Sequence, residues 1–169
     1  MKRKLIAFAW VLALSGCAND ADEDYADRSV DELYNEASDY YEKGSYTKAA
    51  KTFIEIERQH PYSDWALRAQ LRAGEAYYQS KKYEDAIETF NVFIQLHPAH
   101  PDVPYAHYMV GMCYYEQIPT IERDQQVTEM AMKSFQTIIK RYPGTSYAKD
   151  AGMKMDLIND QIAGKEMEV

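Results

Sequence analysis

The sequence predicts an all-α protein, a superhelix built from antiparallel helix pairs. Three Tyr-Tyr pairs stand 37 residues apart and mark an internal repeat: Tyr40-Tyr41, Tyr77-Tyr78 and Tyr114-Tyr115. Within each repeat, apolar residues recur at helical spacing in two series. A repeat of this length is one supersecondary unit that buries its apolar face only by stacking on its neighbours. We therefore expect function to lie on the surface that the stacked units share.

Residues 1–16 have the features of a bacterial lipoprotein signal peptide. A basic stretch at 2–4 precedes an apolar run at 5–14, which is too short to span a bilayer as a mature anchor. The run ends in Leu-Ser-Gly-Cys at 14–17, which resembles the lipobox, where a peptidase cuts before the cysteine and a diacylglycerol is attached to its thiol. We expect export and a lipid anchor at Cys17; the alternative is an uncleaved signal anchor with an incidental cysteine.

Residues 17–28 are expected to join the lipid to the first helix as an acidic, flexible tether. Five of the residues from 18 to 27 are acidic, so the segment repels itself and has little apolar surface to bury. Ala18, where aspartate is the familiar signal for retention at the inner membrane, favours the outer membrane by resemblance. The leader holds three of the 19 Lys and Arg residues and none of the 27 acidic ones, so the mature chain has a net charge of −11. Such a charge disfavours a nucleic-acid partner.

Residues 29–163 are predicted to form the repeat domain. Its three repeats cover residues 30–63, 67–100 and 104–145. The first repeat has two apolar series: Leu33, Ala37 and Tyr40, then Ala49, Phe53 and Ile56. A turn at Gly44 separates them, Ser29 and Glu32 form a capping-box pattern before the first series, and Pro61 ends the unit.

A small residue stands three positions before each Tyr pair, as Ala37, Gly74 and Gly111. It lets the two helices of a pair approach closely, while an aromatic side chain fills the space one turn away. A three-residue insertion before the second repeat is expected to lengthen its leading helix. Eight extra residues separate the two helices of the third repeat around 119–124, where Arg123, Asp124 and Gln125 form a candidate contact loop; a tolerated surface excursion is the alternative.

These positions resemble the tetratricopeptide repeat, which asks for a small residue at place 8, Tyr at 11, Ala at 20, Phe at 24 and Pro at 32. Counted from Val30, the first repeat has Ala37, Tyr40, Ala49, Phe53 and Pro61 at these places. Counted from Leu67, the second has Gly74, Tyr77, Ala86, Phe90 and Pro98. The third has Gly111 and Tyr114, and after its insertion Ala131, Phe135 and Pro143.

One further helix is predicted at 146–162, ending near Gly164. Residues 164–169 are then expected to start another helix whose continuation lies outside this sequence. Four apolar residues of the further helix would lack a cover and form an exposed apolar strip: Met153, Met155, Leu157 and Ile158.

The leading helices of such a superhelix line its inner face, so a binding groove is expected at the places that the core pattern leaves free. These are place 5, with Tyr34, Leu71 and Tyr108, and place 12, with Tyr41, Tyr78 and Tyr115. Tyrosine combines a rigid ring with a polar tip, which suits recognition of an extended peptide. For place 12, packing between repeats is an equal alternative. Arg68 and Arg72 are candidates to pair with a peptide carboxylate, or else ordinary solvated charges.

The sequence carries no motif for catalysis or for binding a cofactor. It has no Gly-rich phosphate loop, no Cys-x-x-Cys pair and no His-Glu-x-x-His, so we expect a non-enzymatic protein without a cofactor or metal. His97, His100 and His107 are close in sequence, but no carboxylate stands at chelating spacing and a structural role fits them better. Cys113 has no partner once Cys17 is lipidated, which favours packing over a disulfide or a reactive thiol.

Together these features resemble the BamD, or ComL, family of outer-membrane assembly lipoproteins over essentially the whole chain. They are the lipobox, the acidic tether, repeats that open with Asp31-Glu32-Leu33-Tyr34, the insertion with Arg123-Asp124-Gln125, and Ala-Gly-Lys-Glu-Met-Glu at 163–168. The resemblance implies a lipoprotein at the periplasmic face of the outer membrane that binds the POTRA domains of the barrel protein BamA and other Bam lipoproteins. It also implies N-terminal repeats that hold the C-terminal signal of unfolded β-barrel proteins, which ends in an aromatic residue and a free carboxylate.

We therefore expect a non-catalytic scaffold of the β-barrel assembly machinery. The alternative is another repeat lipoprotein of the envelope that recruits peptidoglycan hydrolases or division proteins, and a hydrolase with an unrecognised site is a third class. Members of the family usually have more repeats than this chain, so we expect the sequence to be a fragment; a shortened homologue is the other explanation.

Overall fold

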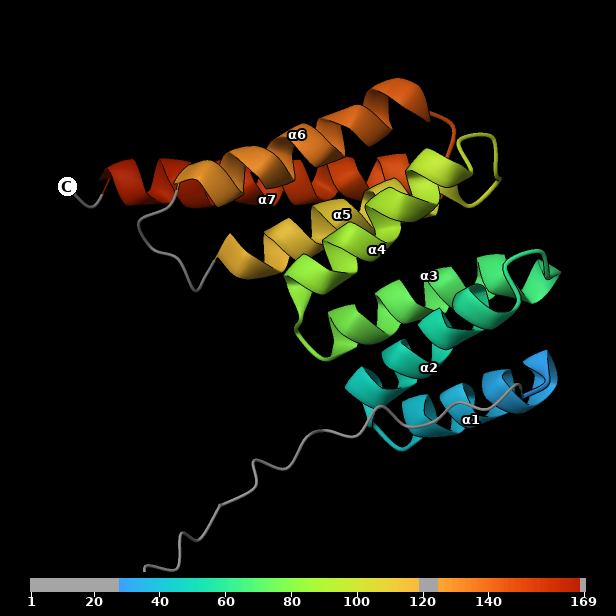
Figure 1. Cartoon of the computed structure of the whole chain (residues 1–169). Helices are drawn as coiled ribbons and strands as arrows, with labels where there is room; N and C mark the ends of the chain where they lie inside the picture. The colour runs from blue at the N-terminus through green and yellow to red at the C-terminus, as the bar shows by residue number, and fades with distance from the viewer. Residues whose placement is uncertain (1–27, 119–124, 168–169) are drawn as a thin grey trace, which may run out of the picture.

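The computed structural model describes residues 28–118 and 125–167, which form α-helices joined by short turns. The helices are α1 Val30–Glu42, α2 Tyr46–Gln59, α3 Asp64–Gln79, α4 Tyr83–Leu96, α5 Val103–Gln117, α6 Gln125–Arg141 and α7 Ser146–Met167. The first six form three antiparallel pairs and α7 follows them (Figure 1). The predicted all-α architecture of helix pairs is confirmed. The signal peptide, residues 17–27 of the expected tether, and Arg123 and Asp124 lie outside the described residues, whereas Arg28 at the end of that tether is described and packs on the first helix pair.

The leading helices α1, α3, α5 and α7 make one layer of the array. In addition to the contacts between helices that are consecutive in sequence, α1 packs on α3, α3 on α5, and α5 on α7. Each second helix, α2, α4 or α6, packs against the leading helices before and after it. The stack runs from α1 at one end to α6 and α7 at the other (Figure 1). The array therefore has an inner face of leading helices and an outer face of second helices.

The turns inside the first two pairs use the same backbone geometry. Gly44 and Lys81 follow α1 and α3 at equivalent places, and both adopt positive φ angles, 74° and 60°. Their amides donate to the carbonyl oxygens of Tyr41 and Tyr78 at 3.0 and 2.9 Å. Glycine reaches this conformation freely, whereas the Cβ of lysine is crowded there. The repeat thus determines turn geometry as well as apolar positions.

Close approach within the pairs depends on the small residue predicted at place 8. A Cβ added to Gly74 would lie 2.7 Å from the Phe90 ring, and one added to Gly111 would lie 2.7 Å from the Phe135 ring. Both distances are shorter than van der Waals contact, so a side chain at either place would force the phenylalanine ring to shift. The equivalent Ala37 is fully buried in the core of the first pair. The predicted close approach of the two helices at the small residue is confirmed, and the aromatic side chain that fills this space at Gly74 and Gly111 comes from the second helix.

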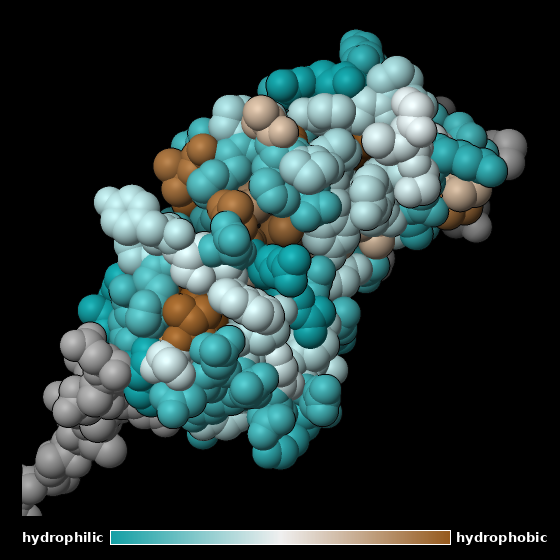
Figure 2. All heavy atoms as spheres, turned by 90° about the vertical axis from the view of Figure 1, so that its right-hand side faces the viewer, coloured by the Kyte–Doolittle hydropathy of each residue, from teal (hydrophilic) through white to brown (hydrophobic). Residues whose placement is uncertain are grey.

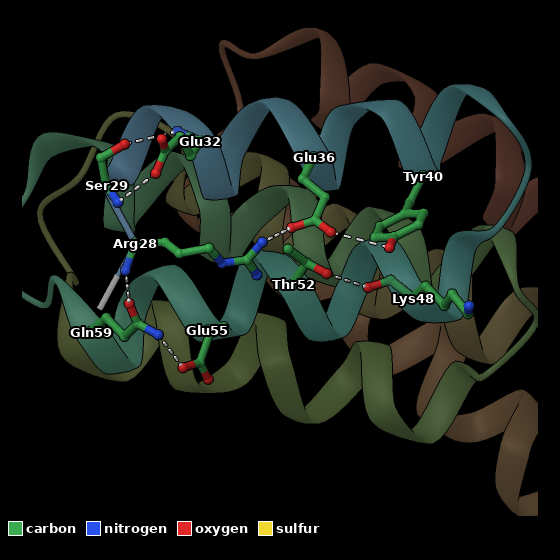
Figure 3. Close-up of polar contacts among 9 residues, drawn as sticks. All are labelled: Arg28, Ser29, Glu32, Glu36, Tyr40, Lys48, Thr52, Glu55 and Gln59. Atoms are coloured by element: carbon green, nitrogen blue, oxygen red, sulfur yellow. Dashed lines mark hydrogen bonds and ion pairs between the residues drawn. The ribbon is translucent and has the colours of Figure 1, made fainter. Parts of the chain in front are cut away.

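Polar contacts tie the start of α1 to the end of α2 (Figure 3). The Ser29 hydroxyl accepts from the Glu32 amide at 3.3 Å and the Glu32 carboxylate accepts from the Ser29 amide at 3.1 Å, which confirms the predicted capping box. The Arg28 guanidinium pairs with Glu36 of α1 at 2.5 Å, and the Arg28 amide donates to Oε1 of Gln59 at 3.3 Å. Arg28 therefore links both helices of the first pair.

Helix α7 is longer than predicted. It continues through Gly164 to Met167, whereas the sequence predicted an end at Ile162, near the glycine. A single glycine costs only about 1 kcal/mol inside a helix, and this is too little to end one when the flanking residues favour the helix. The prediction of the helix end was therefore wrong.

The apolar strip expected on α7 is only partly exposed. Met153 and Leu157 are 51% and 47% exposed, but Ile158 is 1% exposed. Met155 is half-buried and packs against the core of the third repeat. Positions 155 and 158 point roughly half a turn away from position 153 at 100° per residue, so they face α5 and α6 instead of solvent. The strip prediction was wrong for these two residues.

The largest fully buried side chains of the described residues are phenylalanines. Phe53, Phe90, Phe93 and Phe135 are fully buried. On the face shown in Figure 2, apolar residues form small separate patches within a mainly hydrophilic surface. None of the helices in the described ranges is long and apolar enough to cross a membrane.

Candidate functional site

The inner face of the array contains a pocket of about 420 Å³, here called the inner pocket. All four leading helices and the turn before α5 line it with Tyr34, Arg68, Leu71, Arg72, Glu75, Asp102, Tyr105 and Tyr147. Pockets of this size hold a small ligand or a few side chains of a peptide. Because its residues come from successive repeats, the inner pocket exists only when the repeats are stacked.

One end of the inner pocket is aromatic and presents a guanidinium. The Tyr34 ring packs against Phe53 at 5.4 Å and against Trp65 at 4.7 Å between centroids. Arg68 places its guanidinium carbon 5.5 Å from the centre of the Trp65 ring. The Arg68 side chain is exposed and makes no ion pair with any residue that the structure describes. It is therefore available to a negatively charged ligand.

Glu75 is the polar centre of the inner pocket. Its Oε2 accepts from Nη1 of Arg72 at 2.6 Å, and its Oε1 accepts from the Tyr105 hydroxyl at 2.7 Å. Arg72 also lies over the Tyr41 ring, 4.4 Å from its centre. Burial raises the pKa of the Tyr105 and Tyr41 hydroxyls, and the negative charge of Glu75 adds to both shifts. One carboxylate thus connects side chains from α1, α3 and α5.

The other end of the inner pocket is a tyrosine cluster between α5 and α7. The Tyr147 ring lies 5.5 Å from the Tyr105 ring and 5.5 Å from the Tyr108 ring. The Tyr108 hydroxyl donates to Asp150 of α7 at 2.5 Å. Burial raises the pKa of Tyr108, and this hydrogen bond raises it further. The clustered hydroxyls of Tyr105 and Tyr108 therefore remain protonated donors at neutral pH, oriented by carboxylates.

A family-wide sequence profile matches most of the chain. The profile is that of the YfiO family, described as an outer membrane lipoprotein, and it matches residues 26–169. The chain belongs to the YfiO family of outer membrane lipoproteins. This membership confirms the predicted outer-membrane location and lipoprotein class.

Curated relatives in the YfiO family carry the name outer membrane protein assembly factor BamD. The protein of Caulobacter vibrioides is 41% identical over 173 residues, which cover 99% of this chain and 57% of the relative. The protein of Rickettsia prowazekii is 37% identical over 158 residues, which cover 94% of this chain and 63% of the relative. The protein of Neisseria gonorrhoeae is 33% identical over 184 residues, covering 100% and 69%. The resemblance to the BamD family is confirmed, and the chain spans less than two thirds of the length of the first two relatives.

A solved structure shares the fold of this YfiO-family chain. PcrH of Pseudomonas aeruginosa superimposes with a TM-score of 0.55 at 17% identity, covering 88% of this chain and 99% of PcrH. At such identity the likeness concerns the fold alone. It supports the array of helix pairs.

The inner pocket brings together four of the eight residues predicted for the groove: Tyr34, Arg68, Leu71 and Arg72. Leu71 is only 8% exposed because most of its side chain packs in the core of the second repeat. Tyr41 adjoins the inner pocket through Arg72, and Tyr108 adjoins it through Tyr147.

Tyr78 and Tyr115 lie away from the lining of the inner pocket. The Tyr78 ring packs edge-on against Tyr83 at 5.9 Å, and its hydroxyl donates to Glu116 at 3.3 Å. Tyr115 lies 6.2 Å from Phe135 and under the Lys154 ammonium at 4.9 Å. Place 12 is roughly 10 Å further along the leading helix than place 5, where contacts between repeats surround it. A binding role for these two tyrosines stays a prediction.

Four residues of the inner pocket were not predicted: Glu75, Asp102, Tyr105 and Tyr147. Three of them follow the repeat, since Tyr105 and Tyr147 share place 2 with Arg68, and Glu75 stands at place 9. Places 2, 5 and 9 are three and four residues apart and so lie on one helix face. Examining the residues one helical turn before and after place 5 would have identified these three. Asp102, in a turn, carries no repeat signal.

The histidines considered as metal ligands and the cysteine considered as a reactive thiol lie in packed surroundings. His97 and His100 pack on Phe93 with ring centroids 5.5 and 5.3 Å apart. In the parts of the chain that the structure describes, no group of three His, Cys, Asp or Glu side chains could hold a metal ion. Cys113 is fully buried, and burial raises its pKa to about 12. Gln125, the described member of the candidate contact loop, begins α6 and is exposed.

Proposed function

We propose that this chain acts as a non-catalytic assembly factor for outer-membrane β-barrel proteins and binds their unfolded C-terminal segments in the inner pocket. Its relatives are named as assembly factors and not as enzymes. The observation that carries the binding proposal is the inner pocket, which combines tyrosine rings from stacked leading helices with the exposed guanidinium of Arg68.

The chemistry of the inner pocket suits a chain end with an aromatic residue and a free carboxylate. The carboxylate would pair with Arg68, and the aromatic side chain would pack on Tyr34 and Trp65, which already form a ring pair. Glu75 and Asp102 line the same pocket and repel additional negative charge. We therefore propose that one terminal carboxylate is accepted and an acidic segment is rejected.

Two peptides that end in phenylalanine, one with a free carboxylate and one amidated, test this proposal. The Arg68→Gln variant should bind the free-carboxylate peptide about tenfold more weakly, equivalent to about 1.4 kcal/mol, and should bind the amidated peptide unchanged. Lys133→Gln is the matched control, since Lys133 is an exposed cation on α6 away from the inner pocket. Equal binding of both peptides to the unaltered chain would contradict the proposal.

The proposed partners are the POTRA domains of BamA and other Bam lipoproteins, with the lipid at Cys17 holding the array at the membrane. Membership in a family of outer membrane lipoproteins supports this placement. Crosslinking in native envelopes should recover BamA with the lipidated chain. Recovery of peptidoglycan hydrolases without BamA would favour the alternative scaffold instead.

A further inference from the structure

A second groove lies on the outer face of the array, here called the outer groove. Helices α2 and α4 pack on either side of α3 (Figure 1). Residues of α3 form the floor of the groove, and residues of α2 and α4 form its walls. Its volume is about 290 Å³, which is room for one or two side chains of a partner. Its lining shares no residue with that of the inner pocket.

The floor of the outer groove contains a nearly buried glutamine whose amide has no hydrogen-bond partner among the described residues. Gln70 is 3% exposed and lines the groove, yet its side chain makes no hydrogen bond with any described residue. Nearly all buried polar side chains in proteins are hydrogen-bonded, so the small accessible part of Gln70 is where its amide meets water in the groove. A group that enters the outer groove would complete the hydrogen bonding of Gln70.

The walls of the outer groove carry three carboxylates. Glu57 of α2 and Glu88 of α4 form no ion pair within the described ranges, and Asp85 has one long contact, 4.0 Å, with Lys82. Burial raises the pKa of Glu57, and only the nearby His97 acts in the opposite direction. Asp85 and Glu88 also lie close enough to Tyr77 on the floor to add to the effect of burial on its raised pKa. Two of the three carboxylates, Glu57 and Glu88, therefore line the outer groove without a cation of their own among the described residues.

Apolar side chains complete the lining. Ile54 and Val92, from opposite walls, are each 37% exposed. An arginine side chain matches this combination, because its methylene stem packs on apolar surface while its planar guanidinium donates to several acceptors at once. The carboxylates and the Gln70 oxygen are such acceptors. We infer that the outer groove is a docking site for an arginine-bearing segment of a partner protein.

A peptide with blocked ends and alternating arginine and valine tests this inference on the full mature chain in a zwitterionic detergent. The blocked ends remove the terminal carboxylate that the inner pocket is proposed to bind through Arg68. Fluorescence anisotropy should detect binding of this peptide, and an otherwise identical peptide with citrulline, which is neutral, should bind at least tenfold more weakly. The side-chain amide resonances of Gln70 should shift on titration with the arginine peptide.

Paired variants separate the outer groove from general attraction to an acidic protein. Glu57→Gln with Glu88→Gln should weaken binding of the arginine peptide about tenfold. Glu42→Gln with Asp156→Asn makes the same change in charge on exposed side chains elsewhere and should change affinity less than about twofold. Equal weakening by both pairs would overturn the inference, as would equal binding of the citrulline peptide.

Gln70→Leu supplies a second, independent readout. Leucine has a similar volume and no polar group, so the urea midpoint of unfolding should stay the same or rise, while affinity for the arginine peptide should fall about fivefold. A marked fall in the urea midpoint would show that the amide serves the fold itself and would overturn the inference. Weakening of arginine-peptide binding by Glu75→Gln, which removes a carboxylate from the inner pocket, would assign the peptide to that pocket and would also overturn the inference.

Discussion

The ring of Phe90 occupies the space that a side chain would need at Gly74, where an added Cβ would come within 2.7 Å of it. The relationship recurs one repeat later between Phe135 and Gly111, also at 2.7 Å. Both phenylalanines are fully buried. In each of these two pairs, the second helix therefore comes this close to the leading helix because the leading helix has a glycine at the point of contact.

Gly74→Ala should destabilise the protein. Overpacking against Phe90 costs about 1–3 kcal/mol, and the better helix propensity of alanine offsets up to about 1 kcal/mol of this. Gly152→Ala is the matched control, because nothing lies within 4 Å of a Cβ placed there. It should stabilise α7 by roughly 0.5–1 kcal/mol. Urea denaturation followed by circular dichroism measures both, and equal effects would refute the role of Phe90.

Glu75→Gln should strengthen binding of a peptide with a free terminal carboxylate. The substitution releases Arg72 from its ion pair and removes a negative charge from the inner pocket. We expect about threefold tighter binding, equivalent to about 0.6 kcal/mol. Glu36→Gln is the control, since Glu36 likewise accepts from an arginine and a tyrosine, Arg28 and Tyr40, but outside the inner pocket. A similar gain in the control would rule out a local effect.

Cys113 should be inert in the folded chain. Burial raises the pKa of its thiol to about 12, so on the order of one thiol in ten thousand is ionised at pH 8. In the mature chain with Cys17→Ser, Cys113 is the remaining cysteine of the two in the sequence. A thiol-reactive chromophore should react slowly with the native protein and rapidly in denaturant. Rapid reaction of the native protein would contradict a packing role.

His107 should make stability depend on pH. Burial lowers the pKa of His107 below the ordinary 6.5, and the positive charge of Arg141 lowers it further. The Nε2 atom of His107 is buried and has no hydrogen-bond partner among the described residues. The unfolded chain therefore binds a proton near pH 6.5 when the folded chain does not, so stability falls as pH drops through that value. The loss should continue until the pH passes below the lowered folded pKa.

His107→Phe keeps an aromatic ring beside Tyr142, 5.8 Å away in the native chain, and removes this titration. The urea midpoints at pH 7.5 and 5.5 should therefore differ less in the variant than in the native protein. If both proteins lost the same stability over this range, His107 would not be the cause.

The helix pairs could be predicted because their signals are local and repeated. Gly74 and Gly111, with their phenylalanines, recur at fixed places of the repeat, and Ser29 with Glu32 forms a cap within a single turn. The end of α7 could not be predicted in this way. Gly164 is a typical stop signal, but a glycine also fits inside a helix at modest cost, and its neighbours decide between the two.

The sequence by itself determined the class of fold, the repeat places and the outer-membrane lipoprotein character of this protein. Only the tertiary structure decided that Arg72, Glu75 and Tyr105 meet in one pocket, that Ile158 is covered, and that the Gln70 amide faces the outer groove. Helical spacing specifies which residues share a face of one helix. The rotation between stacked repeats results from many packing contacts at once, and that rotation decides which faces meet.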